Sequence, residues 1–470
     1  MLAACTRAAV CAGILAAPVA AQSLSTEIDL FGLGDPLTPA KPFGIAYEPV
    51  TDRLFVALSG DFAGNNQAVV IIDPGTDTVL GTIDVGLFPE DIAFAYDTGG
   101  NLLYGAVTNS TDGSITIWDA SDQVVATVSL PDPFALGTCY PFGIVEKDGH
   151  FYVSTQDGSG DVHAVDWNTL SYDASASFQT GFKSGSRLAV MGDDLWIPTT
   201  EFLPAFDGAK GGLQVHDLSG TTADHGWFAA HADQFLGYPS GQDLAVLSDG
   251  SAILCGLDFG GRLFRVDANG QLDRAIDCEG IDGYGLALSA DQSLLAVAGL
   301  VANEVLLVDL LSETLLSRID VVGLGSGSMQ PNDAVFANGK LYVTVQSSER
   351  VLVFDNLPTA GGSLDFHGSL SISDTTPARG DTIEIDLVGE AGFPVALMTS
   401  SGTTPTVFQG LDFRIGATLV RRASDQDGDV QLQLQIPTNP ALEGKQFFLQ
   451  GYVPDAVGGR VTAPKVLVIQ

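Results

Sequence analysis

Basic residues are scarce in this chain, and this limits what it can bind. Lysine and arginine number 20 against 57 aspartate and glutamate residues, and the formal net charge is −37. Nucleic acids and anionic membrane surfaces are both bound through clustered Lys and Arg side chains, so we expect neither as a partner. The acidic surplus is typical of a protein that stays soluble outside the cell, with cation binding as the alternative role.

Cysteine is scarce as well, and two of the five cysteines lie in the first 21 residues. This segment has one arginine, a short apolar run and a small-residue cleavage site, which predicts a signal peptide over residues 1–21 and export to the periplasm or the medium. Cys139, Cys255 and Cys278 remain, too few for a disulfide framework. We expect three thiols, with a Cys255–Cys278 bridge as the alternative.

Long apolar runs and familiar catalytic motifs are also missing. No later segment of about 20 apolar residues would span a membrane. The sequence has no Gly-x-Ser-x-Gly elbow, no His-Glu-x-x-His pair and no phosphate-binding loop. We therefore expect a binding protein rather than an enzyme.

A repeat of short apolar strands is present instead. Each of seven units has a strand that ends in an apolar residue followed by aspartate, and these aspartates recur every 42 to 51 residues. They are Asp73, Asp119, Asp166, Asp217, Asp267, Asp309 and Asp355. Four strands per unit at this spacing predict the blades of a seven-bladed β-propeller. We expect each aspartate to accept a hydrogen bond from the backbone N–H two residues later, at the turn into the outer strand.

The N-terminal segment predicts how the ring closes. The motif Ile-Asp-x-x-Gly-Leu-Gly occurs at residues 28–34 and again at 319–325, at the end of the sixth unit. The seventh unit lacks an outer strand, so residues 24–31 are predicted to pair with residues 350–356 and complete the last blade.

The end of the chain differs in composition and is predicted to be a separate domain. Short strand patterns fill residues 363–470, and the segment DVQLQLQI alternates polar and apolar residues, as a half-buried strand does. The predicted fold class is therefore all-β: a seven-bladed propeller over residues 22–360, closed by the N-terminal strand, and a C-terminal β-sandwich over residues 363–470.

Three segments resemble a known family. KLYVTVQS (340–347), HFYVSTQD (150–157) and AVVIIDPGTDTVLGTIDVG (68–86) are similar to the YVTN-type repeats of secreted bacterial propellers. The resemblance spans roughly residues 24–360. It implies the propeller fold, and it implies a surface or binding role only loosely, because such propellers carry several functions.

Aromatic residues in the predicted loops suggest a ligand-binding face. Three loops at one end of the propeller carry aromatic rings among small polar residues, which is typical of a binding surface for a protein or carbohydrate. The candidate residues are Phe62, Phe134, Tyr140, Phe202 and Phe206. The alternative is that these rings pack over the ends of the blades.

A second candidate site lies at the channel mouth, where each inner strand begins. The seven units place Gly44, Asp91, Gly143, Arg187, Asp243, Gly285 and Asp333 there. Asp91, Asp243 and Asp333, with Glu90 and Asn332, are oxygen ligands that suit a hard cation such as calcium. The alternative is that each aspartate bonds backbone N–H groups, and Arg187 neutralises one of them.

We therefore predict an exported, monomeric propeller that acts as an extracellular binding or scaffold protein through its loop-rich face, with no cofactor. The alternative is a calcium-dependent hydrolase of lactonase type at the channel mouth, a class suggested by fold analogy.

Overall fold

The fold is described from a computed structural model. The structure describes residues 24–358 except for 36, 62–63, 132–138, 157–158, 181–183, 203–208, 221–224, 229–239, 258–260, 279–280, 282, 312, 323 and 325–329, and beyond residue 358 it describes only strands. The chain divides into two units, one over residues 22–361 and the other over residues 362–470 together with 1–21. The predicted signal peptide lies outside the described residues. No helix within the described ranges is long and apolar enough to cross a membrane.

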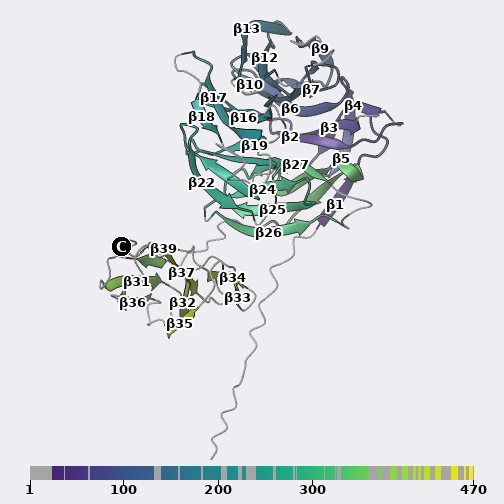
Figure 1. Ribbon diagram of the computed structural model, residues 1–470. Coiled ribbons are helices and arrows are strands. Elements are labelled where there is room, and N and C mark those ends of the chain that lie inside the picture. The colour runs from purple at the N-terminus through teal and green to yellow at the C-terminus, as the bar shows by residue number, and fades with distance from the viewer. Residues whose placement is uncertain are drawn as a thin grey trace, which may run out of the picture. The chain divides into compact units, whose positions relative to one another are not determined.

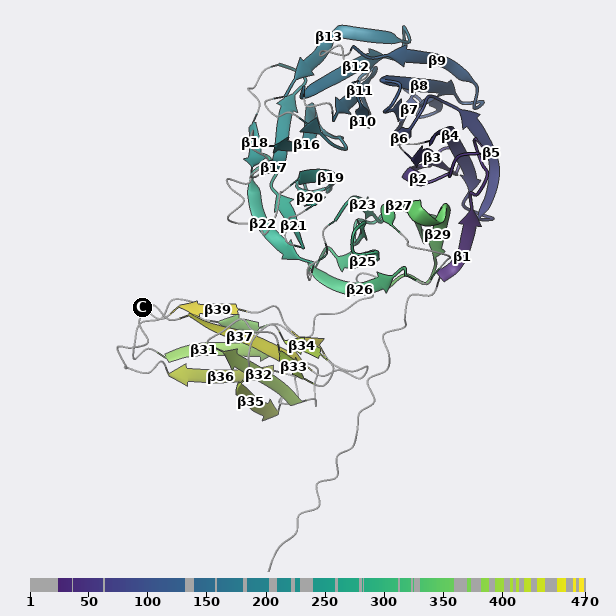
Figure 2. The ribbon, with the colours of Figure 1, turned by 45° about the vertical axis from the view of Figure 1, so that its right-hand side comes forward.

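The first unit is a ring of seven antiparallel sheets, seen along its axis in Figure 2. In each blade the strand nearest the axis begins the unit. Blade 1 contains β2 (Pro42–Glu48), β3 (Arg53–Asp61), β4 (Gly64–Asp73) and β5 (Thr78–Asp84). Blade 2 contains β6 (Pro89–Tyr96), β7 (Leu102–Asn109), β8 (Ser114–Asp119) and β9 (Val124–Ser129). Blade 3 contains β10 (Pro141–Lys147), β11 (His150–Thr155), β12 (Asp161–Asp166) and β13 (Ser171–Gln179).

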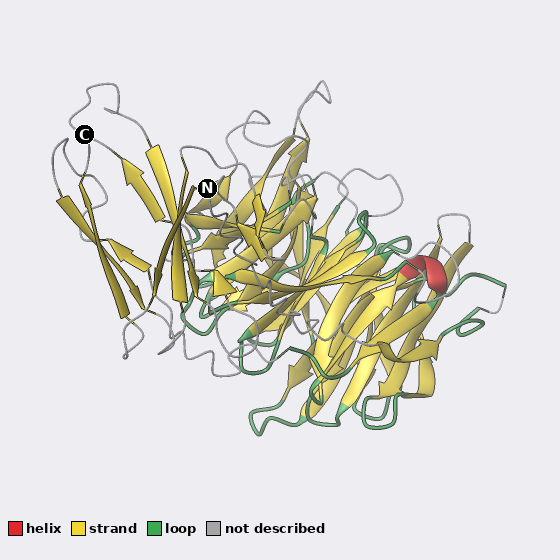
Figure 3. Ribbon diagram, turned by 90° about the horizontal axis from the view of Figure 1, so that it is seen from below, coloured by secondary structure: helices red, strands yellow, loops and turns green. Residues whose placement is uncertain are grey.

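The other four blades repeat this order (Figure 1). Blade 4 contains β14 (Ser184–Gly185), β15 (Ala189–Met191), β16 (Asp194–Phe202), β17 (Ala209–Asp217) and β18 (His225–Phe228). Blade 5 contains β19 (Ser240–Val246), β20 (Ala252–Leu257), β21 (Arg262–Val266) and β22 (Leu272–Asp277). Blade 6 contains β23 (Gly285–Leu288), β24 (Leu294–Gly299), β25 (Glu304–Asp309) and β26 (Thr314–Asp320). Blade 7 contains β27 (Pro331–Ala337), β28 (Lys340–Val345), the 3-10 segment η2 (Gln346–Ser348) seen in Figure 3, β29 (Arg350–Phe354) and β1 (Leu24–Asp29).

The N-terminal strand closes the ring, as the repeated motif predicts. Strand β1 pairs antiparallel with β29, and Ile28 lies opposite Val351. Ile28 is buried, as are Ile83 and Ile319 at the matching positions of blades 1 and 6. Because β1 is the first strand of the propeller unit and β29 is its last, their pairing fastens the first blade to the last.

The repeated aspartates form the predicted turns. The carboxylate accepts a hydrogen bond from the N–H two residues later at Asp73, Asp119, Asp166, Asp217, Asp267 and Asp309. Asp355 differs because its outer strand comes from the other end of the chain, and its Oδ2 accepts a 3.0 Å hydrogen bond from the Ser25 hydroxyl on β1. The aspartate pattern is therefore explained by turn geometry.

Apolar side chains pack between neighbouring blades rather than in one central core. One buried cluster joins Ile28 and Val353 of blade 7 to Leu54 and Val70 of blade 1. Another joins blades 1 and 2, where Trp118 packs on Phe55 with ring centroids 5.9 Å apart. These interfaces hold the blades at fixed angles and leave the inner strands around the axis.

The second unit is also built from strands. One sheet pairs β30 (Leu370–Ile372), β31 (Thr382–Val388) and β36 (Asp429–Gln435). A second contains β32 (Pro394–Ser400), β35 (Thr418–Ala423), β37 (Gln446–Val453), β38 (Arg460–Val461) and β39 (Lys465–Val468). A hairpin joins β33 (Thr406–Phe408) and β34 (Leu411–Phe413). The packing of these sheets into a sandwich stays a prediction.

Candidate site at the propeller axis and the loop-rich face

Three aspartates at the starts of the inner strands each bond backbone groups of two blades. Asp91 on blade 2 accepts N–H bonds from Ile92 in its own strand and from Ile144 on blade 3, both at 3.0 Å. Asp243 on blade 5 likewise accepts N–H bonds from Leu244 in its own strand and from Leu286 on blade 6. These carboxylates therefore fasten neighbouring blades together.

Asp333 on blade 7 repeats the arrangement toward blade 1. It accepts from Ala334 at 2.8 Å and from Ile45 on blade 1 at 2.9 Å. The Thr344 hydroxyl adds a link by donating to the carbonyl of Phe43 at 2.8 Å. A Cβ at Gly44 would lie 2.1 Å from the backbone oxygen of Glu90, so the close approach of inner strands requires glycine there.

Arg187 supplies the positive charge at this ring of acids. Its Nη1 lies 2.6 Å from Asp333 Oδ1 and 3.2 Å from Asp243 Oδ2, which links blade 4 to blades 7 and 5. All three side chains are at least nine-tenths buried. The sequence placed Arg187 beside these carboxylates, and the structure shows that it pairs with two of them.

Burial and crowding of negative charge perturb these acids. Burial raises the pKa of Asp243 to about 7 and that of Asp91 to about 6, although Arg187 opposes both shifts. The pKa of Glu90 is raised well above its usual value by burial and by the neighbouring Asp91. Removal from water disfavours a carboxylate, so these groups hold protons at pH values where an exposed acid is ionised.

Glu90 and Asn332 form a second layer that contains unsatisfied polar atoms. Glu90 Oε2, Arg187 Nη2 and both amide atoms of Asn332 are buried and have no hydrogen-bond partner among the described residues. Blades 1, 3 and 6 place aromatic rings at the matching position: Phe43 meets Phe142 at 5.8 Å and Tyr284 at 6.1 Å, both edge to face. The sequence carried a signal for this layer, since the polar residues occupy positions where blades 1, 3 and 6 have Phe or Tyr.

The proposed cation ligands are thus already engaged. Two of the three aspartates pair with Arg187, and all three accept backbone N–H bonds. Within the part of the chain that the structure describes, no group of three or more His, Cys, Asp or Glu side chains is arranged to hold a metal ion. Calcium at Asp91, Asp243 and Asp333 stays a prediction that requires displacement of Arg187.

The structure describes only some of the five aromatic residues predicted to bind a ligand. Phe62, Phe134 and Phe206 lie outside the described residues, and Phe202 ends β16 without a described side chain. Tyr140 precedes β10 and is 45% exposed.

Exposed apolar side chains that sequence reasoning did not predict lie at the same end of the propeller as Tyr140. In an antiparallel four-stranded blade, outer-to-inner and second-to-third connections emerge at one end, which we call the loop-rich face. Phe31 and Leu37 follow β1, Val322 follows β26, and Val301 lies between β24 and β25, so all four are on this face. They are 76%, 93%, 58% and 76% exposed. No periodic pattern marks single residues in turns, so their exposure emerges only from the folded chain.

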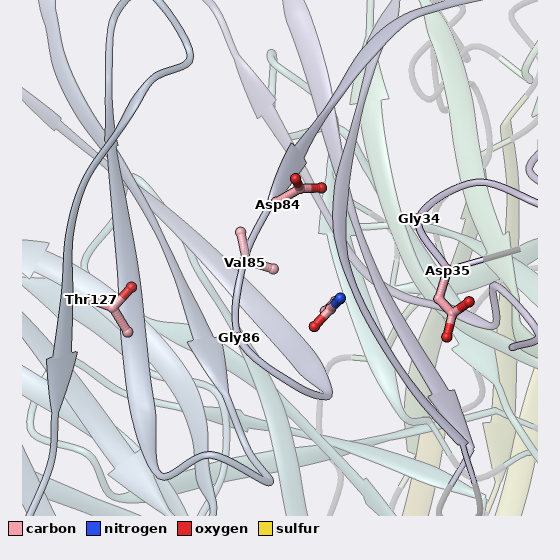
Figure 4. A pocket seen from close by; sticks show the side chains of 7 residues that line it. Gly34, Asp35, Asp84, Val85, Gly86 and Thr127 are labelled. Atoms are coloured by element: carbon pink, nitrogen blue, oxygen red, sulfur yellow. The ribbon is translucent and has the colours of Figure 1, made fainter.

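A polar cavity also opens on the loop-rich face, between blades 1 and 2 (Figure 4). Its volume is ≈ 460 Å³, and its lining includes Asp35, Gln67, Asp84 and Thr127. Asp35 belongs to the connection that follows the closing strand, and its carboxylate already accepts bonds from Leu37 N–H and the Thr38 hydroxyl. The cavity therefore depends on ring closure.

Comparisons with known proteins agree with the fold. No family model matches the sequence, and no curated protein does. Among solved structures, a chain of Kuenenia stuttgartiensis hydrazine synthase is similar over 68% of this chain and 97% of its own, with a TM-score of 0.51 and 14% identity. The Myceliophteria thermophila Cps50 (Swd1) β-propeller domain is similar over 72% of this chain and 100% of its own, with a TM-score of 0.51 and 11% identity. These likenesses show a β-propeller and carry no activity over to this chain.

Proposed function

We propose that this protein is exported and acts as an extracellular binding or scaffold protein through its loop-rich face. The observation that carries the proposal is the set of exposed apolar side chains Phe31, Leu37, Val301 and Val322, which lie in one turn of blade 6 and in the connections that join blades 6, 7 and 1. Large apolar side chains that remain in water and gather on one face are typical of interaction sites. The propeller supplies a rigid support for them.

Backbone hydrogen bonds fix the turns that carry Phe31, Val301 and Val322. In blade 6 a 3.0 Å hydrogen bond from Val321 N–H to the carbonyl of Asn303 joins the two turns that carry Val322 and Val301. In blade 7 Leu30 N–H bonds the carbonyl of Glu349 at 3.0 Å, directly before Phe31. A fixed apolar surface loses little conformational entropy on binding, which favours affinity.

The proposed partner presents an apolar or mixed surface and is not a polyanion. The net charge of −37 repels nucleic acid and anionic lipid, so a protein or carbohydrate of the cell surface is the class we propose, bound by a monomer. The resemblance of three segments to YVTN-type repeats supports a secreted bacterial origin, and the C-terminal β unit would serve as an attachment module.

Paired surface variants test the proposal. Purified wild-type protein should be retained on cell-envelope fragments of the producing cells, and Phe31→Ser with Val322→Ser should weaken retention at least about tenfold, since buried apolar anchors dominate interfaces. Val50→Ser with Leu311→Ser is the control, because these residues are 51% and 80% exposed but lie at the opposite end of the blades. Equal retention by both double variants would contradict a role for the loop-rich face.

Export is tested separately, so that the two parts of the proposal can fail independently. The processed protein should be found outside the cytoplasm and should begin at Gln22 by N-terminal sequencing. Cytoplasmic protein that starts at Met1 would refute export.

The alternative function is a calcium-dependent hydrolase at the channel mouth. It would use Asp91, Asp243 and Asp333 as cation ligands, with Glu90 and Asn332 nearby. The ion pairs of Arg187 with Asp243 and Asp333 weigh against it, because a positive charge already occupies the centre of the carboxylates.

A further inference from the structure

The polar layer at the axis has hydrogen-bonding capacity that the described part of the chain does not use. Glu90 Oε2, Arg187 Nη2 and the Asn332 Oδ1 and Nδ2 atoms lack partners among the described residues. The three residues are 6%, 7% and 0% exposed, respectively. Buried polar atoms without partners are costly and are rare in folded proteins. Four such atoms from blades 2, 4 and 7, at adjacent positions near the starts of the inner strands, therefore indicate that something else satisfies them.

Glu90 and Asn332 stand at the same position in their blades as Phe43, Phe142 and Tyr284, and Arg187 belongs to the adjacent ring of acids at the axis. Burial and Asp91 raise the pKa of Glu90 on blade 2, and the charge of Arg187 on blade 4 opposes that rise. The pKa of Tyr284 on blade 6 is raised first by burial and then by the charge of Glu90. These shifts agree with the axial position that the repeat gives Glu90.

Aromatic rings meet at the axis beside these polar groups. Phe43 on blade 1 touches both Phe142 on blade 3 and Tyr284 on blade 6. These rings belong to blades on either side of Phe43, so they meet over the same axis as the polar groups.

The mixture of donors and acceptors selects the chemistry of the occupant. Arg187 Nη2 and Asn332 Nδ2 are donors and would repel a cation, while Glu90 Oε2 would repel an anion in its ionised form. A hydroxyl group satisfies all of them, because it both donates and accepts. The edges and faces of Phe43, Phe142 and Tyr284 suit the apolar C–H surface of such a molecule.

We propose that the propeller axis is a binding site for a small neutral polyol, of the class of glycerol and the monosaccharides, held by Glu90, Asn332 and Arg187 and flanked by the three aromatic rings. This site is separate from the apolar residues of the loop-rich face. A polyol there would join the inner strands of blades 2, 4 and 7, and its binding would stabilise the ring by linkage.

Calorimetric titration with glycerol and with glucose, at millimolar concentration in polyol-free buffer, tests the site. We expect saturable binding of at least one probe to the wild-type chain. Asn332→Leu and Glu90→Leu, on different blades, should each weaken it about tenfold or more, the factor that one lost hydrogen bond produces. If one variant fails to fold by circular dichroism, the other still decides.

A control variant distinguishes this site from the cavity between blades 1 and 2. Gln67 lines that cavity, and Gln67→Leu should bind the probe like the wild type. Loss of binding in Gln67→Leu with retention in Asn332→Leu would place the polyol in that cavity and overturn the proposal. A crystal structure soaked with the probe should show it at the axis, and density for water molecules alone would overturn the proposal as well.

Discussion

Arg187 on blade 4 and Asp333 on blade 7 meet at the propeller axis, 2.6 Å apart from Nη1 to Oδ1, and the same Nη1 reaches Asp243 on blade 5. One guanidinium thus joins blades 4, 5 and 7, and its bond to Asp333 spans 146 residues of sequence. The pair is buried, so its removal leaves charges that water does not solvate.

Replacement of Arg187 should destabilise the propeller strongly. Arg187→Met leaves Asp243 and Asp333 without their counter-charge, and we expect a loss of about 3–5 kcal/mol in the free energy of unfolding. Calorimetry should show a clear fall in Tm. Arg318→Met is the control, because Arg318 pairs at 2.8 Å with Glu304 in a half-exposed ion pair on the outer strand of blade 6, and its loss should cost less than about 1 kcal/mol. Equal effects would show that the axial pair is dispensable.

Stability should fall as pH rises from about 5 to 8. The folded-state pKa of Asp243 is raised to about 7 and that of Asp91 to about 6, so the folded protein binds more protons than the unfolded chain in this window. The contribution of these two groups to the free energy of unfolding is fully present below their pKa in the unfolded chain. It is lost as the pH rises through their pKa values in the folded protein. Below about pH 4 the sign reverses, because turn aspartates such as Asp73 and Asp267 have lowered pKa values. Tm measured at pH 5, 6, 7 and 8 should decrease, and Asp243→Asn should reduce the slope. A Tm that rises over this range would contradict the assignment.

The closing strand should be essential for the ring. Ile28→Asp places a charge in the apolar interface of blades 7 and 1, and burial of Ile alone contributes about 2–3 kcal/mol. Thermal unfolding should show a much larger drop for Ile28→Asp than for Val50→Asp, since Val50 is 51% exposed in a turn. Deletion of residues 22–34 should lower Tm further, and an unchanged Tm would disprove closure by β1.

Calcium should leave the wild-type chain unaffected. Arg187 occupies the centre of the axial carboxylates, so neither added calcium nor EDTA is expected to shift Tm. A calcium-dependent rise in Tm that EDTA reverses would instead support the hydrolase alternative, because ligands that bind only the native state stabilise it.

The three thiols should be protected in the folded protein. Cys139, Cys255 and Cys278 are buried and form no disulfide, and burial raises the pKa of Cys255 well above its usual value. Since the thiolate is the reactive form, a thiol reagent should label them slowly until denaturant is added, after which three thiols react. A peptide linking Cys255 and Cys278, found by mass spectrometry without reduction, would contradict the structure.

Features set by local chemistry could be predicted from the sequence. In blades 1 to 6 the aspartate at the end of the third strand accepts a hydrogen bond from the N–H two residues later. Because this turn needs the same residue at the same place each time, Asp73 and its equivalents reveal the repeat and its turns. The copy of a strand motif at residues 28–34 predicted closure because the seventh unit lacked that strand.

The axial site could be predicted only in part, because it depends on distances between blades. The sequence identified Asp91, Asp243, Asp333 and Arg187 as a ring. The choice of Asp333 and Asp243 as partners of Arg187 follows from how seven sheets pack, which no spacing along the chain specifies. Asn332 was recognised as an oxygen ligand, but its lack of a partner among the described residues emerges only when the ring is assembled.

The origin of β1 at the opposite end of the chain also fixes the order in which the molecule can fold. Ser25 bonds Asp355 across 330 residues of sequence, so the first strand of the propeller must wait until the last strand of the propeller has been made. Blades 1 to 6 contain their own strands and can form as local hairpins, whereas blade 7 requires a contact of very high sequence separation, which is slow to form. Completion of blade 7 is therefore the final, committing step, and until then both ends of the incomplete ring expose strand edges that another chain can pair with.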